Sequence, residues 1–128
     1  MSEMNSLHNI AVWIDIPVAN LERASAFYAA TLGIGVHSAE FNEFKFSVFD
    51  HEAGNGGCLL PNEAEITGTA GILVYLNVDG RIRDALVKAT TNGGKVVKPV
   101  HPIGEHGFRA VILDSEGNRI ALHSTRDS

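Results

Sequence analysis

Apolar and polar residues in the first half of the chain follow two periodicities, one typical of strands and one typical of a helix. Residues 10–18, IAVWIDIPV, are rich in β-branched and aromatic side chains, which predicts a strand that ends near Pro17. Asn20 is a good helix N-cap, and apolar residues recur after it at helical spacing until Gly33. Period-two alternation and turn residues then predict three short strands, near 35–40, at 44–50 and at 56–61.

The same order of elements is expected again in the second half, after a linker at 62–71. Residues 72–78, ILVYLNV, predict a strand. Asp79 is expected to cap a helix that has apolar residues on one side and ends at Gly93. Three further strands are predicted at 95–100, 108–114 and 119–124.

A weak internal repeat connects the two halves. Val18 and Val78 precede the two helices, Gly33 and Gly93 follow them, and both pairs are about 60 residues apart. Near the ends of the halves, Gly54-Asn55 corresponds to Gly117-Asn118 at a slightly larger offset. Each half therefore is predicted to form a βαβββ unit.

Three stretches carry a resemblance to a known family. These are IPVANLERASAFYAATLGIGV, LVYLNVDG and GEHGFRAVILDSEGNRIALHS, which together span both halves. They resemble the vicinal oxygen chelate superfamily, also called the glyoxalase/bleomycin-resistance fold, and within it small glyoxalase-like proteins. The resemblance implies an α+β fold in which two modules form a half-open barrel around a cavity. We expect one domain over 1–128, with module one at about 8–61, the linker at 62–71 and module two at about 72–125.

Composition and charge exclude several classes of partner. The chain has 128 residues, is 45% hydrophobic and carries a formal net charge of -5, so it has neither a basic footprint for nucleic acid nor an apolar run long enough for a membrane span. Its first nine residues do not resemble a signal peptide. Cys58 is the only cysteine, which leaves no internal disulfide and favours a cytoplasmic location.

The resemblance also implies where a metal ion would bind. Metal-dependent members hold one divalent cation with four side chains, typically His, Glu or Gln. Family spacing and the internal repeat place those positions at Trp13, Cys58, Leu73 and Ala121. Trp, Leu and Ala side chains cannot ligate a metal, and one thiol does not make a zinc site. We therefore expect no metal at this site and no other cofactor.

Moving two residues along each strand keeps the same face and reaches different side chains. These positions are Asp15, Leu60, Tyr75 and His123. A carboxylate, a phenol and an imidazole can perform general acid-base catalysis. Asp15 is the candidate base, His123 the candidate acid or orienting donor, and Tyr75 the candidate hydrogen-bond donor to a developing oxyanion. Trp13 is expected to line the cavity.

The loop HPIGEHG at 101–107 offers further candidates, because two glycines and a proline give it an unusual backbone. Glu105 or His106 can contact a ligand at the mouth of the cavity. An alternative is a displaced metal site that combines His106 with Asp15 and His123, since His and carboxylate suit Zn²⁺, Fe²⁺ or Mn²⁺.

Two functions remain open from the sequence. The first is an enzyme of the lyase or isomerase type that acts on a small polar organic molecule through Asp15, Tyr75 and His123. The alternative is a non-catalytic module that binds a small molecule or drug, as in the bleomycin-resistance branch. By resemblance, we expect a homodimer in either case.

Overall fold

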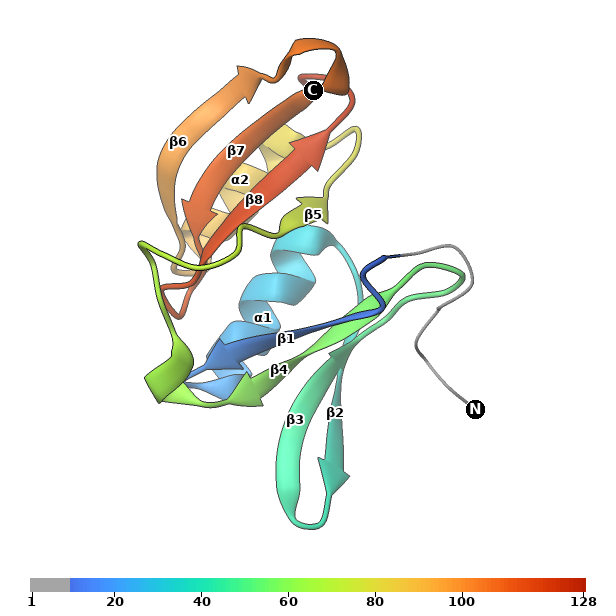
Figure 1. Cartoon of the computed structure of the whole chain (residues 1–128), viewed down its shortest axis with the longest axis vertical. Coiled ribbons are helices and arrows are strands. Elements are labelled where there is room, and N and C mark those ends of the chain that lie inside the picture. Colours follow the sequence, from blue (N-terminus) through green and yellow to red (C-terminus); the bar gives the residue numbers. More distant parts are fainter. Residues whose placement is uncertain (1–9) are drawn as a thin grey trace.

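Each half of the chain forms a four-stranded sheet covered by one helix, as the computed structural model of residues 10–128 describes it (Figure 1). The expected start of module one, residues 8 and 9, lies outside the described residues. The elements of the first half are β1 (Trp13–Val18), α1 (Leu21–Leu32), β2 (Val36–Phe41), β3 (Phe44–Phe49), β4 (Gly56–Pro61) and the short 3-10 helix η1 (Glu63–Glu65). Those of the second half are β5 (Tyr75–Asn77), α2 (Ile82–Thr91), β6 (Lys95–Pro102), the 3-10 helix η2 (Gly104–His106), β7 (Phe108–Leu113) and β8 (Arg119–Ser124).

The two sheets have the same topology, β1-β4-β3-β2 and β5-β8-β7-β6, and the first strand of each pairs in parallel with the last. Asp15 lies opposite Cys58 in the first sheet, and Tyr75 lies opposite Ala121 in the second. Tyr75 follows Asp15 by about 60 residues and Ala121 follows Cys58 by about 63, so equivalent pairs in the two sheets reproduce the repeat found in the sequence. The prediction of an α+β fold with two βαβββ modules in a half-open arrangement is confirmed.

One face of each sheet is buried against its helix. In the first half, Phe27 and Tyr28 of α1 are fully buried in a core that also contains Val18 and Leu59. In the second half, Ile82, Ala85 and Ala89 of α2 are buried in the same core, together with Ile112 and Leu122. The helices also pack against each other, as Figure 1 shows at its centre. Because side chains alternate along a strand, the remaining face of each sheet is left open.

Two local expectations differ from the structure. The N-cap position of α2 is Arg81, not Asp79, and it has no side-chain cap. Asp79 instead accepts hydrogen bonds of 2.6 Å from the backbone N–H and the hydroxyl of Thr125, which lower the pKa of its carboxyl. The Asp79 carboxylate therefore bonds the C-terminal segment instead of capping α2. The strand expected at 72–78 is also shorter, since regular pairing covers only Tyr75–Asn77. The Asn20 cap is confirmed by a bond from the Arg23 N–H.

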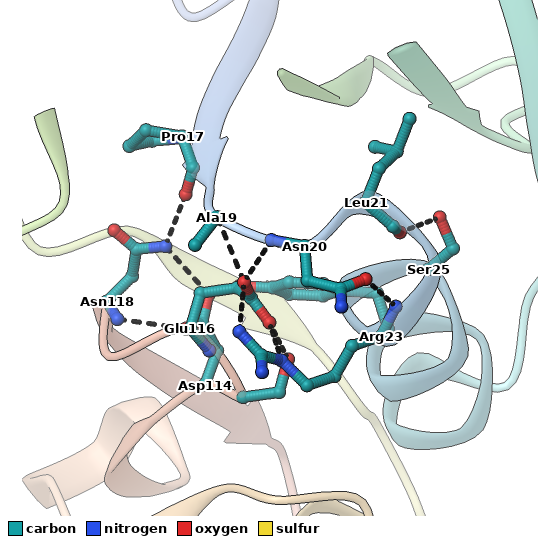
Figure 2. A network of polar contacts seen from close by, with 11 residues as sticks. Pro17, Ala19, Asn20, Leu21, Arg23, Ser25, Asp114, Glu116 and Asn118 are labelled. Atoms are coloured by element: carbon teal, nitrogen blue, oxygen red, sulfur yellow. Dashed lines mark hydrogen bonds and ion pairs between the residues drawn. The ribbon is translucent and has the colours of Figure 1, made fainter. Parts of the chain in front are cut away.

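A polar network joins the β7–β8 turn to the first half of the chain (Figure 2). Asp114 is 2% exposed and accepts four hydrogen bonds. Its Oδ1 accepts from the backbone N–H groups of Glu116 and Asn118, and its Oδ2 accepts from the Tyr28 hydroxyl at 2.5 Å and from the Asn118 amide. The Asn118 amide also donates to the Pro17 carbonyl at 2.7 Å. The turn thus fastens β7 and β8 to β1 and α1.

Glu116 adds a charged contact between the β7–β8 turn and the first half of the chain. Its side chain is fully covered, and it accepts from the backbone N–H groups of Ala19 and Asn20 and from the Arg23 guanidinium at 2.7 Å. Burial by itself would raise the pKa of the Glu116 carboxyl. The bonds from Arg23, Asn20, Ser115 and Ala19 outweigh burial and lower this pKa to about 2.

Replacing Glu116 with Gln is therefore expected to flatten the acid dependence of stability. Because the folded-state pKa lies below the ordinary 4.5, the stabilisation is present above that pH and is lost as the pH falls toward 2. We expect Glu116→Gln to lower the free energy of unfolding at pH 7 by about 2 kcal/mol. Urea unfolding at a series of pH values measures both effects. Asp127→Asn, which removes an exposed ion pair with Arg83, is the control and should change stability by less than about 0.5 kcal/mol. Equal pH profiles for Glu116→Gln and the wild-type protein would contradict this account.

Candidate functional site

The open face of the first sheet carries a small cluster built on β1 and β4. Trp13 donates its indole N–H to Cys58 Sγ at 3.4 Å, and the Cys58 thiol donates to Asp15 Oδ1 at 3.2 Å. The ring of His51 meets Trp13 edge-on at 5.8 Å. Burial raises the pKa of the Cys58 thiol to about 11, with Asp15 adding to the effect against the bond from Trp13. Cys58 therefore stays a neutral thiol at physiological pH.

The open face of the second sheet carries a larger cluster, built on β5, β6, β7 and β8. Arg109 lies at its centre, opposite His101 on β6 and His123 on β8. It donates Nη1–H to the Tyr75 hydroxyl at 2.5 Å and Nε–H to His101 Nε2 at 2.9 Å. Its guanidinium carbon lies 5.9 Å from the centre of the Tyr75 ring, and the Tyr75 and His123 rings are 6.5 Å apart.

The partners of the two histidines in this cluster define their tautomers. A guanidinium only donates, so His101 Nε2 accepts, and His101 Nδ1–H donates to the Pro99 carbonyl at 2.8 Å. A carbonyl only accepts, so His123 Nε2–H donates to the backbone oxygen of His106 at 2.7 Å. His123 Nδ1 is then the atom left for a ligand, as an acceptor when the ring is neutral and as a donor when it is protonated.

The structure divides the predicted site residues between the two clusters. Trp13 and Asp15 lie in the first, and Tyr75 and His123 lie in the second. Within residues 10–128, no hydrogen bond or ring contact connects the clusters. A hollow of 160 Å³ between the halves is lined by Ile14 and other largely apolar side chains, and none of the four predicted residues contributes to it.

Within the described part of the chain, the side chains of Glu105 and His106, expected at the mouth of the cavity, do not bond the cluster on the second sheet. Glu105 and His106 belong to η2, and both are exposed. His106 touches the cluster through its backbone carbonyl, not through its imidazole. Gly107 follows at a φ of 96°, and a Cβ there would lie 2.5 Å from the Ser124 carbonyl. The loop therefore needs glycine to approach β8 and hold His123.

The residues at the four expected metal-ligand positions do not fit a metal ion. Trp13 and Ala121 face the open side without a donor, Leu73 precedes β5, and Cys58 is a neutral thiol bonded to its neighbours. In the part of the chain that the structure describes, no three side chains of His, Cys, Asp or Glu are grouped so that they could hold a metal ion. The displaced site of Asp15, His123 and His106 is accordingly not assembled in these residues.

Sequence reasoning missed three members of the clusters. Arg109 could have been found by counting outward from the turn at 114–118, because a hairpin that pairs Leu113 with Arg119 also pairs Arg109 with His123. His101 could not, because the register between β6 and β7 shifts twice before it reaches Arg109. His51 lies in the loop between β3 and β4. No periodic signal indicates that its ring would meet Trp13.

Comparisons with known proteins agree with this architecture. The family profile described as the Glyoxalase/Bleomycin resistance protein/Dioxygenase superfamily matches residues 10–122. A glyoxylase-like domain-containing protein of Didymella fabae is 28% identical over 123 residues, which are 91% of this chain and 94% of that protein. Among solved structures, a glyoxalase/bleomycin resistance protein/dioxygenase family enzyme from Burkholderia phytofirmans PsJN has 20% identity and a TM-score of 0.69, covering 88% of this chain and 96% of its own. A genomically encoded fosfomycin resistance protein from Listeria monocytogenes has 15% identity and a TM-score of 0.68, covering 92% and 94%.

Proposed function

Because the chain belongs to the Glyoxalase/Bleomycin resistance protein/Dioxygenase superfamily, we propose that it binds a small polar organic molecule on the open face of its second sheet. We propose further that it transforms this molecule by metal-free general acid-base catalysis of the lyase or isomerase type. The observation that carries the proposal is the pairing of Tyr75 with His123. The Tyr75 hydroxyl accepts a hydrogen bond of 2.5 Å from Arg109. The neighbouring His123 uses Nε2 to bond the His106 carbonyl, which leaves its Nδ1 for a ligand.

Tyr75 has the role of a donor to a developing oxyanion. Its oxygen accepts from Arg109, so its own O–H is left to donate to a ligand. The adjacent positive charge strengthens that donation when negative charge develops on the substrate. His123, oriented by the His106 carbonyl, exchanges a proton through Nδ1.

Asp15, the proposed base, has no hydrogen bond to this cluster within residues 10–128, where its side chain accepts from Cys58. We propose that the protein is a homodimer in which Asp15 and Trp13 of one chain lie across the ligand from Tyr75 and His123 of its partner, with Glu105 or His106 at the mouth. The tip of the β2–β3 hairpin supports an interface, since Phe41 is 69% and Phe44 47% exposed. Figure 1 shows this hairpin extending away from the rest of the molecule.

Light scattering at micromolar concentration is expected to give the mass of a dimer. Changing Phe41 and Phe44 together to Ser should shift the protein toward the monomer, because apolar area is then lost from the interface. Val87→Ser on α2 removes a comparably exposed apolar side chain and should leave the mass unchanged. A monomer for the wild-type protein would contradict the proposed dimer.

Non-catalytic binding is the second candidate, and one observation favours it. Asp15 is held by Cys58, and no described contact connects it to Tyr75 or His123. A site without an engaged base binds a polar molecule but does not turn it over. In that case Tyr75→Phe would change affinity alone.

The two candidates are separated by screening small polar molecules for binding and turnover with the wild-type protein, Tyr75→Phe and His123→Gln. The proposed enzyme requires turnover that both substitutions reduce.

Residues 10–128 contain no helix with the length and apolar character of a membrane span. A cytoplasmic location, expected from the sequence, is part of the proposal.

A further inference from the structure

Arg109 is a positive charge held in place without a negative partner. Among the described residues, Arg23, Arg81 and Arg83 each pair with a carboxylate. Arg109 is bonded instead to the neutral groups of Tyr75 and His101, and no carboxylate in residues 10–128 lies within ion-pair distance of it. A fixed, partly buried guanidinium with neutral neighbours attracts an anion.

The hydrogen bonds of Arg109 leave some N–H groups of its guanidinium available to a ligand. A guanidinium has five N–H groups, of which one on Nε and one on Nη1 are used. Nη2 has no hydrogen-bond partner among the described residues, so N–H groups on adjacent nitrogens remain. Two such groups side by side match the two oxygens of a carboxylate.

The site is also organised before a ligand arrives. His101 fixes one edge of the guanidinium, and His101 is itself fixed by the Pro99 carbonyl. Tyr75 holds Nη1 and places its ring near the guanidinium. Binding an anion here costs little side-chain entropy, because the long arginine side chain is already ordered.

We propose that Arg109 binds the carboxylate of a short organic acid that carries an oxygen substituent on the adjacent carbon. The Tyr75 hydroxyl lies 2.5 Å from Nη1, which places it within reach of a substituent one carbon away from a bound carboxylate. His123 on β8 lies beside it, with its ring 6.5 Å from that of Tyr75. This inference rests on the proposed function, since it assigns a substrate class to the same site.

The test is a titration followed by NMR of the Arg109 Nε–H and the His123 ring, in the full-length protein. The probes are lactate, propionate, lactamide and inorganic phosphate. Lactate should give saturable shifts with a dissociation constant in the range of about 1–100 mM, and lactamide should bind about 10- to 100-fold more weakly. Propionate should bind more weakly than lactate but shift the Arg109 signal.

Arg109→Gln should weaken lactate binding by about 10- to 100-fold, and Arg109→Lys should restore part of it. Arg83→Gln is the matched control, because Arg83 is exposed and paired with Asp127, and it should bind lactate like the wild-type protein. Circular dichroism confirms that each variant is folded.

Four results would overturn the inference: equal binding of lactate and lactamide, phosphate binding as tight as lactate, unchanged lactate binding in Arg109→Gln, or no saturable shift with lactate up to about 100 mM. Its failure differs from that of the proposed function. If neutral molecules bind and are turned over in a manner that depends on Tyr75, the proposed function stands and the carboxylate assignment fails.

Discussion

Replacing Asp114 with Ala is expected to lower the free energy of unfolding by about 3–5 kcal/mol. The carboxylate is 2% exposed and accepts from four donors, one of which is the fully buried Tyr28 hydroxyl. Alanine would leave these donors without their acceptor inside the protein. Burial is the largest cause that raises the pKa of the Tyr28 hydroxyl, and it persists in the variant, so Tyr28 cannot relieve the loss by ionising.

Urea unfolding at pH 7 measures this loss, and two variants locate its cause. Asp114→Asn keeps one oxygen as an acceptor and should be less destabilising than Asp114→Ala. Asp127→Ala, at an exposed ion pair, should cost less than about 0.5 kcal/mol. A loss below about 1 kcal/mol in Asp114→Ala would show that the turn does not fasten the two halves together.

Tyr75→Phe is expected to reduce the catalytic rate by about 100- to 1,000-fold, which is the usual loss when one oxyanion donor is removed. The ring stays and only the hydroxyl is lost. Tyr75 is 46% exposed, so the free energy of unfolding should change by less than about 0.5 kcal/mol. The measurement is kcat and KM on the first substrate that the screen finds.

The distribution of the loss separates catalysis from binding. If the hydroxyl acts on the transition state, kcat and kcat/KM should fall together in Tyr75→Phe. Val97→Ala, a substitution at another half-exposed position in the second sheet, should leave both values unchanged. An unchanged kcat in Tyr75→Phe would remove Tyr75 from the chemistry and favour the binding module.

The local pattern of apolar and turn residues was sufficient to predict most of the helices and strands. The strands expected at 56–61 and 119–124 have those bounds in the structure, because turn residues flank each of them. Asp79 was misassigned because a residue that can cap a helix can equally bind the backbone of a distant segment, here Thr125. The second-half opening strand is short because only three of its residues pair with β8.

The site was only partly predictable, for a related reason. Alternation along β5 and β8 was enough to place Tyr75 and His123 on the open face. It could not place Arg109 between His101 and His123, since that depends on the register of three strands. Nor could it relate Asp15 to Tyr75, because the helix packing of α1 on α2 positions one sheet against the other.

Metal content and chelator response test the central claim, a site that works through Tyr75 and His123 and not through a bound cation. The protein is purified without added metal, its transition metals are counted by mass spectrometry, and its melting temperature is measured with and without chelator. The account predicts far less than one metal ion per chain and an unchanged melting temperature. A bound ion present at about 1,000 times its dissociation constant stabilises a protein by about 4 kcal/mol. One ion per chain, together with a drop of many degrees on chelation, would contradict the account.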